Sequence, residues 1–155
     1  MADLLTYDED IAFSLADHAA TVSAIVRRTP DERLRATRFG EWSAKEVIGH
    51  LADTAEIFAE RVRRCIEEND PELPAFDQEQ LARERNNQEG DAMQLSRRLQ
   101  AAHQSMIQRL QRVGAAQRRG RHSEIGQVTA GHFAAYVARH AGEHVTELQR
   151  AFPPA

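Results

Sequence analysis

The segment Arg139-His140-Ala141-Gly142-Glu143-His144 places two histidines four residues apart, near the end of the last helical stretch of the chain. At that spacing two side chains lie one above the other on the same helix face, about 6 Å apart along the axis. Histidines directed into a core need hydrogen-bond partners or a metal ion, because a buried polar group without a partner is costly. The pair therefore indicates either a structural hydrogen-bond network or part of a metal site. The other residues of this face are Phe133, Tyr136, Val137 and Leu148.

The length and composition are those of an ordinary globular protein. A chain of 155 residues, 41% hydrophobic and 28% charged, fits one domain over 1–155. The formal net charge of −4 gives no electrostatic argument for binding nucleic acid. Cys65 is the only cysteine, which excludes a disulfide framework and a cysteine metal cluster. The sequence shows neither a signal peptide nor an apolar run of about 20 residues. We therefore expect a cytoplasmic protein with no membrane partner.

Four amphipathic stretches with apolar residues at helical spacing predict four helices. The first begins at the capping box Thr6-Tyr7-Asp8-Glu9, and the second begins at the capping box Ser43-Ala44-Lys45-Glu46. No stretch shows strand-like alternation of useful length. The sequence thus predicts an all-α four-helix bundle with long connections after the first and second helices. The expected helices cover about 6–28, 43–69, 91–114 and 129–151.

The connections between these helices are polar and carry Pro or Gly. In the first connection, Phe39 and Trp42 are expected to pack over the end of the bundle. The second connection, 70–90, has room for a short helix over 77–85 and can cover one end of the bundle. The segment 115–128 is predicted to be a basic loop. Its arginines are typical of a solubilising surface, and the alternative is that they hold an anionic cosubstrate.

His50 lies at the margin of the apolar stripe of the second helix. Ligands for metals in helix bundles come from facing helices, so His50 and the pair His140 and His144 could meet around one ion. Three protein ligands with positions left open are typical of a catalytic or substrate-binding centre. Imidazole ligands suit Zn, Ni, Cu and Fe alike, so the ligand type does not fix the metal. Spacing alone does not connect His50 to the pair, and a structural role for all three histidines stays open.

Two motifs resemble one family. The run Glu41-Trp42-Ser43-Ala44-Lys45-Glu46-Val47-Ile48-Gly49-His50-Leu51-Ala52-Asp53 closely resembles the second-helix signature of the DinB/YfiT-like superfamily. Gly126-Gln127-Val128-Thr129 followed by His140-Ala-Gly-Glu-His144 resembles the last-helix pattern of that family. The resemblance covers essentially the whole chain. It implies a four-helix bundle, a homodimer, and a divalent metal, Zn or Ni, bound by His50, His140 and His144.

Two acidic residues lie near these histidines in the sequence. Many members of the family carry Gln where this chain has Glu147, on the same helix face as His140 and His144. We expect Glu147 to orient a metal ligand or to pair with an Arg, rather than to bind the metal itself. Asp53, three residues after His50, could hydrogen-bond that histidine or simply be solvated. Neither acid is an obvious general base. Structural roles are expected for the remaining candidates His18, His103 and His132, the last being a weak candidate for lining a pocket.

The resemblance implies an enzyme that uses its metal to activate water or a thiol. Characterised members include transferases that use low-molecular-weight thiols such as bacillithiol or mycothiol, and others are regarded as metal-dependent hydrolases. We therefore expect a hydrolase or a thiol S-transferase acting on a small molecule. One alternative is a non-catalytic bundle that binds a metal or small ligand in a stress response. Another is a core in which the histidines form a hydrogen-bond network without metal.

Overall fold

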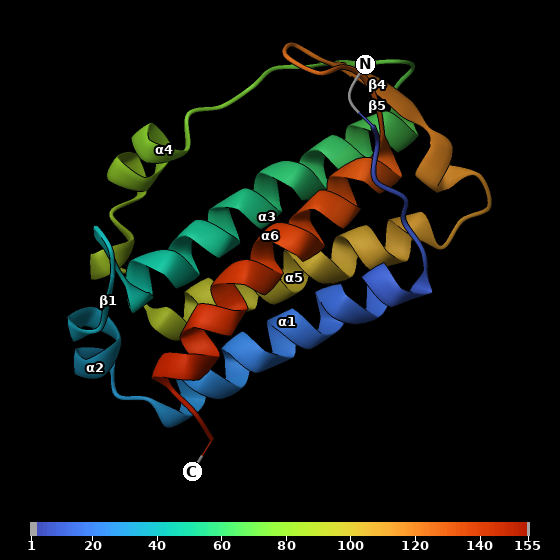
Figure 1. The fold of residues 1–155 in the computed structure, drawn as a ribbon. Coiled ribbons are helices and arrows are strands. Elements are labelled where there is room, and N and C mark those ends of the chain that lie inside the picture. Colours follow the sequence, from blue (N-terminus) through green and yellow to red (C-terminus); the bar gives the residue numbers. More distant parts are fainter. Residues whose placement is uncertain (1–2, 155) are drawn as a thin grey trace.

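The computed structural model describes residues 3–154 and confirms the four-helix bundle. The long helices α1 (Glu9–Arg28), α3 (Ala44–Glu67), α5 (Ala92–Leu110) and α6 (Ala130–Ala151) lie side by side (Figure 1). Each of α1 and α3 packs against both α5 and α6, so α1 and α3 lie diagonally across the bundle. Helix α6 runs antiparallel to α3, as the colours in Figure 1 show. This neighbour relation brings the last helix against the second expected helix.

The helices begin at residues whose side chains satisfy free backbone N–H groups. At α3 the predicted capping box is confirmed, because Ser43 Oγ accepts from Glu46 N at 3.1 Å and Glu46 Oε1 accepts from Ser43 N at 3.0 Å. The capping box predicted at 6–9 is wrong. The N-cap of α1 is Asp8, whose carboxylate accepts from Ile11 N at 2.9 Å. A carboxylate is favoured there because it also interacts with the positive end of the helix dipole.

The other ends agree with the sequence to within a few residues. Thr129 caps α6 as predicted, with its hydroxyl accepting from His132 N at 3.1 Å. Asp91 caps α5, and its carboxylate accepts from Met93 N at 2.9 Å. Helix α5 ends at Leu110, four residues before the predicted stop at Gly114, where the backbone adopts a left-handed conformation with φ 80°. The glycine therefore ends a turn that follows the helix, not the helix itself.

The connections contain more regular structure than the sequence predicts. The first holds α2 (Asp31–Ala36) and an antiparallel pair of short strands, β1 (Arg38–Phe39) and β2 (Trp42–Ser43). Phe39 and Trp42 pack against one end of the core, as expected. The second holds β3 (Glu72–Leu73), α4 (Gln78–Arg85), which was predicted, and the 3-10 turn η1 (Asn87–Glu89). It runs along the outside of α3 (Figure 1).

The predicted loop over 115–128 is wrong. After the 3-10 turn η2 (Ala115–Gln117), this segment forms an antiparallel hairpin of β4 (Arg119–His122) and β5 (Gly126–Thr129), and β3 adds to it in parallel. Burial does alternate along β4, but the inward positions are Gly120 and His122. Because neither residue is a typical apolar strand residue, the period of two was hidden in the sequence.

The core consists of two apolar clusters along the bundle. One lies towards α2 and includes Ile48, Leu51 and Leu148. The other lies towards the hairpin and includes Phe58 and Phe133. No helix in the described part, 3–154, is long and apolar enough to cross a membrane.

Candidate metal centre

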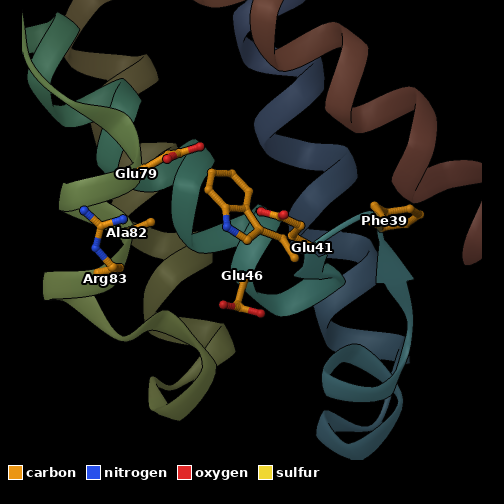
Figure 2. Close-up of a pocket in the computed structure, with 7 residues that line it drawn as sticks. Phe39, Glu41, Glu46, Glu79, Ala82 and Arg83 are labelled. Atoms are coloured by element: carbon orange, nitrogen blue, oxygen red, sulfur yellow. The ribbon is translucent and has the colours of Figure 1, made fainter.

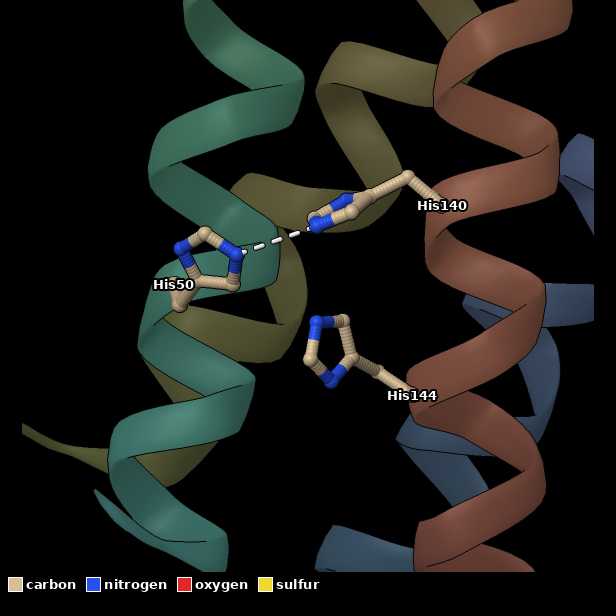
Figure 3. Close-up of side chains that lie close together, drawn as sticks. All are labelled: His50, His140 and His144. Atoms are coloured by element: carbon tan, nitrogen blue, oxygen red, sulfur yellow. Dashed lines mark hydrogen bonds between the residues drawn. The ribbon is translucent and has the colours of Figure 1, made fainter. Parts of the chain in front are cut away.

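The three histidines that the sequence singled out come together between α3 and α6. His50 extends from α3, and His140 and His144 extend from successive turns of α6 (Figure 3). One ring nitrogen from each lies within 4.8 Å of the other two. His50 is 4% exposed, whereas the other two are half-buried. The antiparallel packing of the two helices thus makes one cluster from residues that are 90 positions apart in the chain.

The distances within this cluster suit a shared ion. Two nitrogens bound tetrahedrally to one Zn²⁺ at 2.0–2.1 Å are about 3.3 Å apart. The Nε2 atoms of His50 and His140 are 3.2 Å apart. The three rings stand nearly perpendicular to one another, at interplanar angles of 80° and 81°, with centroids 4.8–5.3 Å apart. Because one nitrogen of each ring lies close to the other two, the group could hold a metal ion.

The surroundings of His50 and His140 favour the neutral form of both imidazoles. Burial, followed by the proximity of His140 and His144, lowers the pKa of His50 to about 3. Burial, followed by the proximity of His144, also lowers the pKa of His140. A metal binds the neutral imidazole, because the protonated ring has no free lone pair. His50 and His140 therefore meet the protonation requirement for ligation at neutral pH.

Three neighbouring side chains hold the histidine rings. Glu147 Oε1 lies 3.0 Å from Nδ1 of His144, which leaves the Nε2 of that ring facing the other two histidines (Figure 3). Trp42 lies against His50 with ring centroids 4.8 Å apart. Tyr136 is stacked on His140 at 6.1 Å and an interplanar angle of 6°. The sequence had placed Glu147 beside the pair, but had not assigned Trp42 or Tyr136 to the centre.

Asp53 serves a different part of the molecule. Its carboxylate is 2% exposed and accepts from Asn87 Nδ2 at 3.0 Å and Arg98 Nη2 at 2.7 Å. Within residues 3–154 it makes no hydrogen bond to His50. Asp53 therefore fastens η1 and α5 to α3, and the residues that complete this network, Asn87 and Arg98, carry no signal in the sequence.

The remaining candidates lie outside the histidine cluster. His103 is buried, with Nδ1 bonded to the carbonyl of Leu15 at 2.7 Å. Cys65 is fully buried, and burial raises the pKa of its thiol to about 11, so it is not a nucleophile. Of the basic residues in 118–121, Arg118 donates to the carbonyl of Glu68, and Arg121 pairs with Asp70 at 3.3 Å.

A cavity of about 520 Å³ lies beside the cluster, on the far side of Trp42. Figure 2 shows its walls, which come from the β1–β2 turn, the start of α3 and the helix α4. Trp42 both lines this cavity and touches His50, whereas none of the three histidines is among its lining residues. Its other lining residues are Phe39, Glu41, Glu46, Glu79, Ala82 and Arg83.

The fold and the site together define a class of protein, namely four-helix bundles that turn three histidines from two neighbouring helices toward one point. The family model of the DinB superfamily matches residues 14–148, and the chain belongs to this superfamily. The fold resembles that of YfiT from Bacillus subtilis, with a TM-score of 0.72 and 21% identity over 92% of this chain and 85% of that one. YfiT is described as a probable metal-dependent hydrolase with an unusual four-helix bundle topology. No curated protein matches this chain by sequence.

Proposed function

We propose that this protein is a metal-dependent enzyme in which His50, His140 and His144 hold a divalent ion. The observation that carries the proposal is the convergence of three imidazoles, one buried and two half-buried, two of them with Nε2 atoms 3.2 Å apart. The description of YfiT as a probable metal-dependent hydrolase supports it. Zn²⁺ and Ni²⁺ are the ions we expect, because both accept imidazole ligands and the DinB-like resemblance implies them.

The residues of this chain would bind and orient the ion. Three histidines leave coordination positions open, and a bound Zn²⁺ lowers the pKa of a water or thiol at such a position. Glu147 accepts a hydrogen bond from Nδ1 of His144. This bond would hold the ring with Nε2 directed toward the ion. Trp42 and Tyr136 pack on His50 and His140 and limit how far those rings can turn.

Two reactions fit this centre. An ion held by His50, His140 and His144 would supply a water activated for hydrolysis of an ester or amide. In a thiol S-transferase it would instead supply an activated thiol for displacement of a leaving group at an electrophilic carbon. The thiol of Cys65 is sealed in the core and stays protonated at neutral pH. The transferase reaction therefore needs a low-molecular-weight thiol as a cosubstrate. Hydrolysis is the simpler proposal, because it requires no second organic substrate.

Metal analysis of the purified protein tests the first part of the proposal. We expect about one equivalent of Zn or Ni in the wild type and a large loss of metal in His144→Ala, with a parallel loss of thermal stability. The matched control is His132→Ala, which removes a histidine from the same helix outside the cluster. A wild-type protein without metal, whose stability does not respond to chelators, would show that the histidines are structural.

Activity assays separate the two reactions. The metal-loaded protein is given a panel of ester and amide substrates, and then electrophiles together with bacillithiol, mycothiol or glutathione. Metal-dependent turnover of the first panel supports the hydrolase, and thiol-dependent turnover of the second supports the transferase. Metal binding without turnover of either panel would favour a non-catalytic metal-binding bundle.

A further inference from the structure

A second site lies further along α3, around a buried arginine without an acidic partner. Arg61 is 6% exposed, and within residues 3–154 it forms no salt bridge. The one hydrogen bond that Arg61 makes to the described residues runs from Nη2 to the carbonyl of Pro74 at 2.7 Å. A buried guanidinium is costly unless its charge is compensated, which makes Arg61 unlike the paired arginines elsewhere on this helix.

The free donors of Arg61 are accessible. The side-chain nitrogen and oxygen atoms that are sealed from solvent without a partner belong to other residues. Arg61 lines a cavity of about 220 Å³ between α3, α6, the β4–β5 turn and the segment that precedes α4. Its remaining N–H groups are therefore reached from a cavity, where a ligand can accept hydrogen bonds from them.

Two histidines in the same cavity add donors. Nδ1 of His122 accepts from the backbone N–H groups of Glu124 and Ile125, at 3.1 and 3.3 Å. Nδ1 of His132 accepts from the backbone N–H of Leu5 at 2.9 Å. A ring nitrogen that accepts a hydrogen bond carries no proton, so the neutral ring carries its proton on Nε2. The neutral rings therefore carry an Nε2–H donor each, and both residues line the cavity.

Four aromatic residues also line the cavity. The guanidinium of Arg61 lies over the rings of Phe58, Phe76 and Phe133, at 4.8, 5.4 and 5.4 Å from their centroids. Tyr136 completes this wall, with its ring centroid 5.3 Å from that of Phe58. A guanidinium group surrounded by aromatic rings suits a ligand in which a planar anionic group, such as a carboxylate, is attached to an apolar group.

We propose that this cavity binds the carboxylate of a small aromatic or apolar acid, with Arg61 as the residue that binds the anion. Tyr136 lines the cavity and stacks on His140 one turn further along α6, so the body of the ligand is directed toward the histidine cluster. That this acid is the substrate of the metal centre rests on the proposed function, whereas its binding does not.

Arg61 lines two cavities, and the positions of nearby acidic residues indicate which of them would bind an anion. A second cavity, of about 370 Å³, is also lined by Arg61. Its other charged residues are Asp53, Glu56, Glu60, Arg64 and Arg85, so an anion bound there would lie beside three acids. Among the residues that line the first cavity, Glu124 is the one acid, and its side chain is exposed. The first cavity is therefore the anion site.

Calorimetric titration of the purified full-length protein tests this proposal. The probes are 3-phenylpropanoate, the neutral 3-phenylpropanamide, and inorganic phosphate. We expect the wild type to prefer the acid to the amide and to phosphate. Arg61→Met should weaken binding of the acid about ten- to a hundredfold and change binding of the amide less than about twofold. Arg97→Met, which removes an exposed arginine from α5, is the matched control and should leave both affinities unchanged.

Further variants keep the test decisive. If Arg61→Met does not fold, Arg61→Lys keeps the charge but loses the planar fork, and should weaken binding of the acid several-fold. A carboxylate bound to the metal would lose affinity in His144→Ala and not in the Arg61 variants, which would overturn the proposal. Equal affinity for acid and amide, a preference for phosphate, or no binding of the acid at millimolar concentration would also overturn it. If the acid binds but the purified protein takes up no metal, the proposed function is refuted and the proposed anion site is not.

Discussion

The substitution Gly49→Ala is expected to destabilise the protein, although Ala is the better helix former. Gly49 lies inside α3, directly before His50. A Cβ at this position would lie less than 3.0 Å from the Cβ, Cγ and Nδ2 atoms of Asn87. Asn87 cannot easily yield, because it is 6% exposed and its Nδ2 donates to the buried carboxylate of Asp53 at 3.0 Å. The added methyl group must therefore displace either η1 or the Asn87 side chain.

Three contributions of opposite sign decide whether Gly49→Ala stabilises or destabilises the protein. Replacing Gly by Ala inside a helix stabilises it by about 1 kcal/mol. Overpacking a filled site costs about 1–3 kcal/mol. Loss of the hydrogen bond to the charged Asp53 costs about 1.5–3 kcal/mol. The free energy of unfolding should thus fall by about 1.5–5 kcal/mol.

Urea denaturation followed by circular dichroism measures this change. The matched control is Gly142→Ala on α6, where a Cβ would meet only the ring end of His18, at 3.2 Å. The control should be within about 1 kcal/mol of the wild type, since a side chain can shift by the few tenths of an ångström required. If Gly49→Ala proves as stable as the wild type or more so, the close packing of η1 on α3 is wrong.

Three further results are expected. Glu147→Ala should lower metal affinity about tenfold in a chelator competition, because Nδ1 of His144 loses its acceptor. Glu147→Gln should retain most of the affinity, because the amide oxygen can still accept this hydrogen bond. Equal affinities in the wild type and both variants would show that Glu147 has no role in the site. Arg98→Met should lower the free energy of unfolding by about 2 kcal/mol with metal affinity unchanged, because it leaves the buried Asp53 without its nearest cation; a loss of metal affinity alone would place Asp53 at the metal centre. Burial lowers the pKa of His103 from 6.5 to about 4, so the unfolded state binds the proton first, and stability should fall as the pH drops from about 6.5 toward 4. Urea titrations of chelator-treated protein at about pH 7 and 5 measure this change. Between these pH values the free energy of unfolding should fall by about 2 kcal/mol less in His103→Leu than in the wild type, and equal falls would contradict this role of His103.

The helices were predictable because their signals are local. Ser43 and Glu46 form the capping box that the sequence shows, and Thr129 caps the last helix as expected. The hairpin was missed because Gly120 and His122, neither of them an apolar strand residue, occupy the buried positions of β4. At Gly120 a Cβ would come within 2.6 Å of Leu73, so no larger residue fits there. A residue selected for close approach does not show the apolar alternation on which strand prediction depends.

The site was predictable only in part. The pair His140 and His144 follows from helical spacing, but His50 is 90 residues away and joined the pair through the family resemblance. Only the packing of α3 on α6 brings the three rings together. The role of Asp53 could not be predicted, because its partners Asn87 and Arg98 come from a connection and from another helix. A carboxylate three residues from a histidine carries the same local signal in either role.

The segment from Gly49 to Asp53 connects the packing of α3 to the geometry of the histidine cluster. Gly49 and Asp53 lie four residues apart on the face of α3 that meets Asn87, whereas His50 lies about 100° further around the helix and meets α6. The contact with η1 therefore fixes the rotation of α3 about its own axis. A rotation of about 5° would move a ring nitrogen that lies about 7 Å from the axis by about 0.6 Å, more than the ~0.2 Å tolerance of a metal–ligand bond. A network that touches none of the histidines thus determines whether His50 reaches the position where the other two converge.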